Sequence, residues 1–232
     1  MRTERRSGLL KALIIIAAFA VLIALGIWQL ERLAWKKDLL ARIAAQQQGA
    51  IVDLPDRIGD PAALEWRRVR LRGHFDHDRE LHLVSGRGYL VVTPLLRPDA
   101  EPVLVVRGFV TQAKLSPDAR REGLVAGEIE LVGVVRLDEK PNAFLPANDP
   151  ARNQWFHREA EAMAGAMGLA HAAPLFVTAI EDAPGGWPKA VRVDGTALPN
   201  NHLSYAITWF GLAAALLVIL LIRLAGARRT QG

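Results

Sequence analysis

The sequence predicts a membrane-anchored α+β protein in which two transmembrane helices flank an antiparallel β-rich extracytoplasmic domain with one or two helices. Two apolar runs, 17 uncharged residues at 12–28 and 18 residues at 205–222, are long enough for helices that cross a bilayer. Between them lie short β-branched segments bounded by Gly, Pro or Asp, which are typical of strands. The predicted parts are an N-terminal tail (1–11), a first transmembrane helix (12–30), a juxtamembrane helix (31–49), a β-rich domain (50–201), a second transmembrane helix (202–222) and a C-terminal tail (223–232).

The first apolar run is expected to be a retained anchor rather than a cleaved signal peptide. Arg2, Arg5, Arg6 and Lys11 precede it, as basic residues do in a signal peptide. The run is longer than the roughly 7–15 apolar residues of a signal peptide, and no small-x-small cleavage pattern follows it. Two spans place both termini on one side of the membrane, and the arginines of the two tails favour the cytoplasm.

The segment after the first span is predicted to continue as a helix. Residues 31–48 are strong helix formers without Gly or Pro. Trp28, Arg32, Trp35 and Leu39 recur at i, i+4, i+7 and i+11 and therefore share one face. Tryptophans are enriched at the membrane interface, so the simplest interpretation of this stripe is an anchor.

Strand patterns with a period of two begin near residue 67. Seven segments have this character: RRVRLRG (67–73), ELHLV (80–84), GYLVVTPLL (88–96), PVLVVRGFV (102–110), IELVGVVRL (129–137), PLFVTAI (174–180) and AVRVDG (190–195). FDHD at 75–78 predicts a hairpin turn between the first two strands. A helix is predicted at 153–168, where Phe156, Ala160, Met163 and Met167 form an apolar stripe that Gly168 ends.

The composition and the motifs of the sequence exclude or disfavour several classes of function. The chain has no cysteine, which excludes a disulfide framework, a CxxCH haem attachment site and a cysteine-based copper relay. The net charge of +5 reflects mainly membrane topology. The segment between the two spans contains no basic stripe interleaved with aromatic residues, so nucleic acid is not an expected partner. No GxSxG elbow, P-loop or GxGxxG motif is present, so nothing in the sequence argues for an enzyme.

Two polar features of the β-rich domain have structural interpretations. His74, His77 and His82 follow the spacing H-x2-H-x4-H, which matches no helical or finger-type metal motif, so a metal site is not favoured. Arg107 ends an apolar run in VVRGFV. It is predicted to be a strand-end arginine whose side chain reaches water, with partner docking as the alternative.

The most specific candidates lie at the start of the second span. In PNNHLSYAITW (199–209), the Pro-Asn-Asn sequence predicts a helix start with Asn as N-cap. His202, Tyr205 and Trp209 then follow at i, i+3 and i+7 and share a face. Such amphipathic residues commonly settle at the bilayer interface. An ionisable residue at the mouth of a transmembrane helix also marks a functional site, and both interpretations stay open.

Six segments occur in a familiar order: LGIWQLERLAWKKDLLARI (25–43), GHFDHDRELHL (73–83), GYLVVTPL (88–95), VLVVRGFV (103–110), NQWFHREAEAMA (153–164) and PNNHLSYAITWF (199–210). In this order, and between two spans, they resemble the SURF1 (Shy1) family of cytochrome c oxidase assembly proteins. The resemblance covers about residues 25–222. Phe109 and Leu90 depart from the family, which commonly has Trp and His at these places, and this weakens any role for that surface of the β-domain.

The resemblance implies a non-catalytic assembly factor that binds haem A and assists its insertion into oxidase subunit I, with haem A synthase as a further partner. His202 fits the second-span histidine implicated in haem binding, and neutral imidazole is a common axial ligand of haem iron. We hypothesise that Tyr205 and Trp209 lie against the macrocycle. In the same hypothesis Trp28 faces the macrocycle from the first helix, and Arg32, Lys36 or Lys37 meets the propionates.

The lack of a serine- and arginine-rich presequence favours a multi-pass protein of the bacterial inner membrane over a mitochondrial one. The main alternative function is a cofactor-free membrane scaffold that stabilises an oxidase assembly intermediate. A two-span receptor is disfavoured, because about ten residues after Ile222 are too few for an output module. A membrane-tethered hydrolase is also disfavoured, since no nucleophile–base pair can be named.

Overall fold

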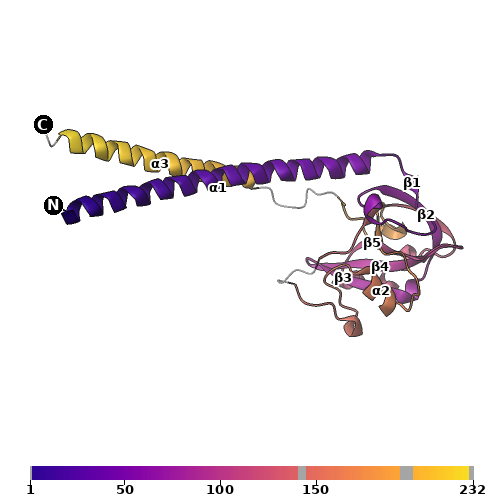
Figure 1. Ribbon diagram of the computed structural model, residues 1–232. Coiled ribbons are helices and arrows are strands. Elements are labelled where there is room, and N and C mark those ends of the chain that lie inside the picture. The colour runs from indigo at the N-terminus through magenta and orange to yellow at the C-terminus, as the bar shows by residue number, and fades with distance from the viewer. Residues whose placement is uncertain (1, 141–144, 194–200, 230–232) are drawn as a thin grey trace. The chain divides into compact units, whose positions relative to one another are not determined.

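The computed structural model describes residues 2–140, 145–193 and 201–229. The chain divides into two compact units, one of Met1–Arg42 with Gly195–Gly232 and one of Ile43–Asp194. The first unit contains most of helix α1 (Arg2–Gln48) and helix α3 (His202–Arg229), and the second contains all the strands (Figure 1). α1 runs without a break through the residues expected to form the first span and the juxtamembrane helix.

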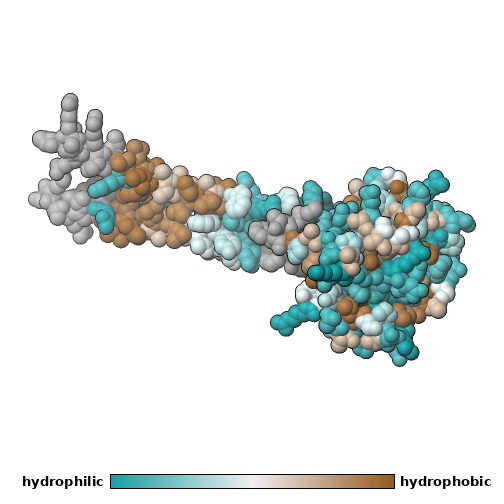
Figure 2. All heavy atoms as spheres, turned by 90° about the horizontal axis from the view of Figure 1, so that it is seen from below, coloured by the Kyte–Doolittle hydropathy of each residue, from teal (hydrophilic) through white to brown (hydrophobic). Residues whose placement is uncertain are grey.

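Helices α1 and α3 are both long and apolar enough to cross a membrane. The qualifying stretches are Leu13–Gln48 and His202–Arg223, and only 11% of the apolar window of each is buried. Figure 2 shows the resulting hydrophobic surface in brown along the helices. An apolar surface of this extent is stable in lipid rather than in water.

The two helices pack against each other through small residues. Gly26, Ala206 and Ala213 are buried at the contact. A Cβ atom at Gly26 would lie 2.6 Å from Cε1 of Phe210, so the absence of a side chain lets the phenyl ring rest on the α1 backbone. Small residues permit this close approach, which is how helices associate in lipid without a hydrophobic driving force.

The second unit is a five-stranded barrel with two additional strands. The strands are β1 (Val52–Asp53), β2 (Arg68–Phe75), β3 (Leu81–Ser85), β4 (Gly88–Leu96), β5 (Val103–Thr111), β6 (Ile129–Arg136) and β7 (Phe176–Ala179). The order β2-β6-β7-β5-β4 closes into a ring because β2 also pairs with β4, at His74–Leu96 and Phe75–Leu95. A Cβ at Gly73 would lie 2.3 Å from the Leu96 oxygen, so this seam requires glycine.

Short helices connect the strands. The one α-helix described within this unit besides the end of α1 is α2 (Ala160–Ala166). The 3-10 helices are η1 (Ala62–Leu64), η2 (His77–Arg79), η3 (Gln112–Lys114), η4 (Pro117–Gly123), η5 (Pro150–Arg152) and η6 (Pro184–Gly186).

Six of the seven predicted strands are confirmed as β2 to β7. The seventh prediction, residues 190–195, is wrong over its described part, because residues 190–193 are irregular. Lys189, just before this segment, forms an isolated bridge with Phe109. Residues 194 and 195 lie outside the described residues. β1 and β2 pair in parallel, as do β5 and β7, so the sheet is mixed and not purely antiparallel. Parallel pairing needs a long connection, and the segment with β6 and α2 between β5 and β7 provides one.

Two local predictions need correction. The chain does turn at residues 75–78, but β2 and β3 form no hairpin, since both pair with β4. The helix predicted from residue 153 begins only at Ala160. Trp155 instead forms a parallel bridge with Leu83, and its indole is completely buried.

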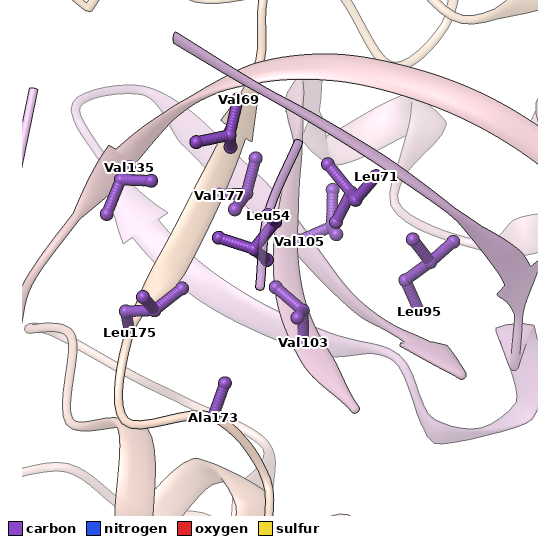
Figure 3. Close-up of a cluster of buried hydrophobic side chains, with 10 residues drawn as sticks. All are labelled: Leu54, Val69, Leu71, Leu95, Val103, Val105, Val135, Ala173, Leu175 and Val177. Atoms are coloured by element: carbon purple, nitrogen blue, oxygen red, sulfur yellow. The ribbon is translucent and has the colours of Figure 1, made fainter. Parts of the chain in front are cut away.

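Strand β5 is buried on both faces and separates two hydrophobic clusters. One cluster lies inside the barrel, because all five barrel strands contribute to it (Figure 3): Leu54, Val69, Leu71, Leu95, Val103, Val105, Val135, Ala173, Leu175 and Val177. The other packs the opposite face against Trp155 and α2. The predicted core role of Ala160, Met163 and Met167 is confirmed there, whereas Phe156 is only partly buried.

Candidate functional site

His202 is the first residue of α3, and its imidazole reaches α1. Its Nδ1 atom lies 2.8 Å from Oε1 of Gln29. Asn201 acts as the N-cap, since its carbonyl accepts the Tyr205 N–H at 3.1 Å. Pro199 and Asn200, which were part of the predicted helix start, lie outside the described residues.

The contact of Nδ1 with Oε1 of Gln29 is compatible with one tautomer of a neutral His202 ring. An amide oxygen can only accept, so Nδ1 donates, and in the neutral ring Nε2 then holds the lone pair. Gln29 is 8% exposed and His202 is half-buried. A neutral imidazole with one nitrogen anchored by an oxygen acceptor is the form in which histidine binds metals.

Two aromatic residues on the His202 face differ in their surroundings. Tyr205 is 54% exposed. Trp209 is half-buried, and its indole N–H is buried with no acceptor among the residues that the structure describes. Buried indole N–H groups usually have a partner, so this one is an unsatisfied donor within the described chain.

Two residues of α1, Trp28 and Arg32, were predicted to belong to the same site as His202. Trp28 is 52% exposed, and the Arg32 guanidinium stacks over the Trp35 ring at 3.9 Å from its centroid. Within the described parts of the chain, neither Trp28 nor Arg32 makes a hydrogen bond, ion pair or ring contact with His202. The residue of α1 that meets the imidazole is Gln29.

Sequence reasoning missed Gln29. Gln29 directly follows the uncharged run 12–28 and lies within the span predicted at 12–30. A signal was present, because a polar side chain at the end of an apolar helix needs a hydrogen-bond partner when it is buried. The sequence alone does not show which residue of the second helix supplies that partner.

The SURF1 family model matches residues 16–214, a range that includes both Gln29 and His202. This chain belongs to the SURF1 family. Surfeit locus protein 1 of Mus musculus is 39% identical over 218 residues, which cover 84% of this chain and 70% of the mouse protein. The Homo sapiens protein is 37% identical over 214 residues, 82% of this chain and 70% of its own length. A SURF1-like protein of Drosophila melanogaster is 36% identical over 224 residues, 84% of this chain and 71% of its own length. The predicted family is therefore confirmed.

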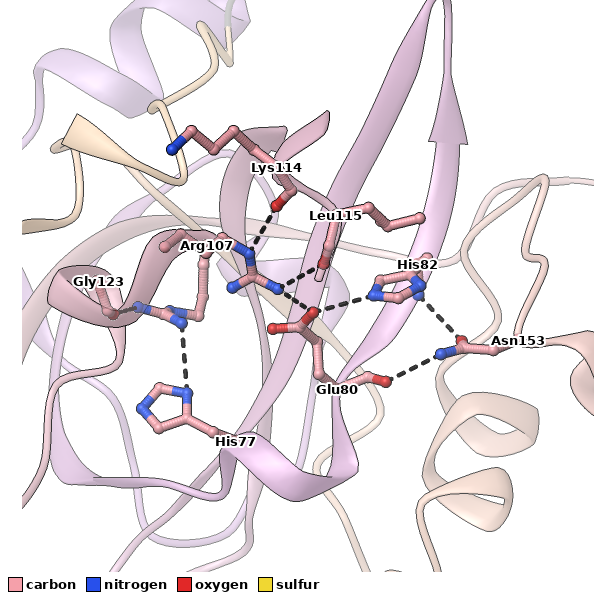
Figure 4. Close-up of polar contacts among 9 residues, drawn as sticks. His77, Glu80, His82, Arg107, Lys114, Leu115, Gly123 and Asn153 are labelled. Atoms are coloured by element: carbon pink, nitrogen blue, oxygen red, sulfur yellow. Dashed lines mark hydrogen bonds and ion pairs between the residues drawn. The ribbon is translucent and has the colours of Figure 1, made fainter. Parts of the chain in front are cut away.

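The β-domain of this SURF1 family member holds a second group of polar residues, centred on Glu80 (Figure 4). The Glu80 carboxylate pairs with the Arg120 guanidinium and lies 3.0 Å from Nε2 of His82. Arg120 also donates to the carbonyl oxygens of Lys114 at 3.0 Å and Leu115 at 3.2 Å. The side chains of Arg120 and Glu80 are 0% and 4% exposed, so their charges depend on these partners for stabilisation.

Arg107 belongs to the same group, which corrects the prediction that it reaches water. It is 4% exposed, donates to the Gly123 oxygen and to Nδ1 of His77 at 3.3 Å, and lies 4.7 Å from the Phe75 ring centroid. Burial lowers the pKa of Arg107 to about 10, so the guanidinium stays charged at neutral pH. A side chain enclosed in this way is not available for partner docking.

A β-bulge accounts for the position of Arg107. In the β4–β5 register Val91 faces Gly108 and Val92 faces Val106, so Arg107 has no partner in the ladder. A bulge of this kind re-aims the extra side chain. Alternation along the strand could not predict that Arg107 points inward.

The three histidines of the H-x2-H-x4-H tract have separate surroundings. His77 Nε2 donates to the Val125 oxygen at 3.0 Å, and burial lowers its pKa. His82 pairs with Glu80, and His74 is exposed on β2. The described residues contain no group of three or more His, Cys, Asp or Glu side chains that could hold a metal ion.

Proposed function

We propose that this chain is a membrane-anchored assembly factor for cytochrome c oxidase that binds haem A through His202 and assists its insertion into subunit I. Membership of the SURF1 family implies the role in oxidase assembly. The observation that supports the haem proposal is the His202–Gln29 hydrogen bond, because it leaves Nε2 as the nitrogen able to donate to iron.

The residues around His202 fit haem A as a cargo. Haem A supplies an iron that accepts an imidazole nitrogen and a macrocycle with polar substituents. His202 offers the nitrogen, and the Trp209 indole offers a buried N–H without an acceptor in the described chain. The exposed ring of Tyr205, one turn from His202, offers an aromatic surface at the same end of α3. These groups bind and orient, and none of them is assigned a step of bond chemistry.

The proposal includes location and partners. The arginines of the two tails support cytoplasmic termini, and we assign the chain to the bacterial inner membrane. Subunit I is the proposed recipient of haem A, and haem A synthase is the proposed donor. The role is non-catalytic, since transfer of haem A requires binding and release alone.

The experiment is purification of the full-length protein in detergent from cells that make haem A, followed by absorption spectroscopy. We expect a low-spin haem A spectrum in the wild type and its loss in His202→Ala. His74→Ala is the matched control, since His74 is exposed in the β-domain, and it should retain the spectrum. A wild-type spectrum in His202→Ala would remove His202 as the ligand. A wild-type protein without any chromophore that still supports oxidase assembly would instead identify a cofactor-free scaffold.

A further inference from the structure

The amide of Gln29 lies in a place where an unpaired polar group is costly. Gln29 follows 17 uncharged residues of α1 and is 8% exposed. Its Oε1 atom meets a ring that is 173 residues away in the chain. The two groups therefore satisfy each other across the contact of α1 and α3, where a lost partner would not be replaced by water.

We propose that Gln29 is the positioning residue for His202, a proposal that rests on the haem-binding function proposed above. Gln29 holds the imidazole as the Nδ1–H tautomer and fixes its ring plane, so that Nε2 is ready to bind iron. An acceptor that hydrogen-bonds the other ring nitrogen of a ligating histidine orients the ring and raises its basicity, and its loss costs about 10–100-fold in metal affinity.

The packing beside this bond supports a fixed ring. Gly26 lies three residues before Gln29 on α1, and the Phe210 ring of α3 covers it. Ala206, one turn after His202, is 1% exposed. The backbones that carry Gln29 and His202 are thus held by tight packing within one unit, so the bond is more than a chance contact of two mobile side chains.

The choice of an amide has a chemical consequence. A glutamate at position 29 would keep the oxygen acceptor but add a negative charge beside the imidazole. The ring would become a stronger electron donor to iron, which lowers the reduction potential of a bound haem. Glutamine supplies the orientation without that charge. A purely structural role of residue 29 predicts no change in potential between glutamine and glutamate.

The test uses full-length protein in detergent micelles titrated with haem A, with His202→Ala beside it. Gln29→Leu removes the acceptor at similar volume, Gln29→Glu keeps it, and Gln46→Leu is the matched control, because Gln46 is an exposed amide of the same helix. We expect haem affinity to fall about 10–100-fold in Gln29→Leu, the haem potential to fall in Gln29→Glu, and no change in Gln46→Leu. In haem-free protein, 15N NMR of labelled histidine should show the Nδ1–H form of His202 in the wild type and its loss in Gln29→Leu.

The outcomes separate this inference from the function on which it rests. If His202→Ala loses haem while Gln29→Leu binds it with wild-type affinity and tautomer, the positioning role is wrong and the haem proposal stands. If His202→Ala binds haem as the wild type does, the haem proposal itself fails. Should Gln29→Leu not fold, the Gln29→Glu protein decides, because an unchanged potential there overturns the positioning role.

Discussion

Replacing Glu80 by Gln tests whether the buried polar group of the β-domain holds the barrel together. The substitution keeps the volume and an oxygen acceptor but removes the carboxylate that pairs with Arg120, whose side chain is 0% exposed. Removing one partner of a buried ion pair costs about 3–5 kcal/mol, because the other charge stays buried without compensation. For a domain of this size each kcal/mol lowers the melting temperature by about 2–4 °C. The expected fall is therefore roughly 6–20 °C.

The assay is thermal unfolding of the full-length protein in detergent, followed by circular dichroism and by tryptophan fluorescence, to which the fully buried Trp155 contributes. Glu130→Gln is the matched control, since Glu130 also pairs with two arginines, at 3.2 Å and 2.7 Å, but its side chain is 44% exposed. Exposed pairs contribute little, so its melting temperature should stay within about 2 °C of the wild type. A Glu80→Gln protein as stable as the wild type, or a control that loses as much, would refute the reasoning.

Three further outcomes are expected. Burial lowers the pKa of His77 in the folded protein. As the pH falls below about 6.5, His77 therefore binds a proton in the unfolded chain before it does so in the folded protein. The melting temperature should therefore fall between about pH 7.5 and 5.5, and a melt series should show a flatter dependence in His77→Gln. Gly26→Leu should lower the SDS concentration at which α1 and α3 separate, since overpacking costs about 1–3 kcal/mol. Adding Phe210→Ala to this variant should return that concentration to the wild-type value. A double variant that still separates at low SDS would argue against the ring contact. Met163→Ala should lower the free energy of unfolding in urea by about 2–5 kcal/mol, because the Met163 side chain is 0% exposed. Glu161 is exposed, so Glu161→Ala should cause no measurable change in that free energy.

Local patterns carried most of the fold prediction. Apolar runs and alternation of period two are properties of neighbouring residues, so both long helices and six strands were found from sequence. Ring closure at Gly73 and the parallel pairing of β5 with β7 depend on residues far apart in the chain, and no local pattern encodes them. β1 has only two residues, too few for any pattern.

The candidate site also contains some residues that local sequence patterns predict and others that only tertiary contacts reveal. Helical spacing at the start of the second span predicts His202, Tyr205 and Trp209 as candidates, and the family resemblance singles out His202 among them. Gln29 was missed because its role appears only when α1 and α3 meet. Arg107 was wrongly assigned to the surface, since a one-residue bulge reverses the face that alternation predicts.

Closure of the barrel also bears on how copies of this domain behave when they are crowded in one membrane plane. Open sheet edges template aggregation between neighbouring molecules. Here the outer side of β3 is occupied, since Val84 N–H donates to the Trp155 oxygen at 2.6 Å and Trp155 N–H donates to the His82 oxygen at 3.1 Å. The opposite outer strand, β1, offers only two residues. Among the described residues the domain therefore offers little sheet edge to which a second copy could add a strand, so edge-to-edge association of copies is not favoured.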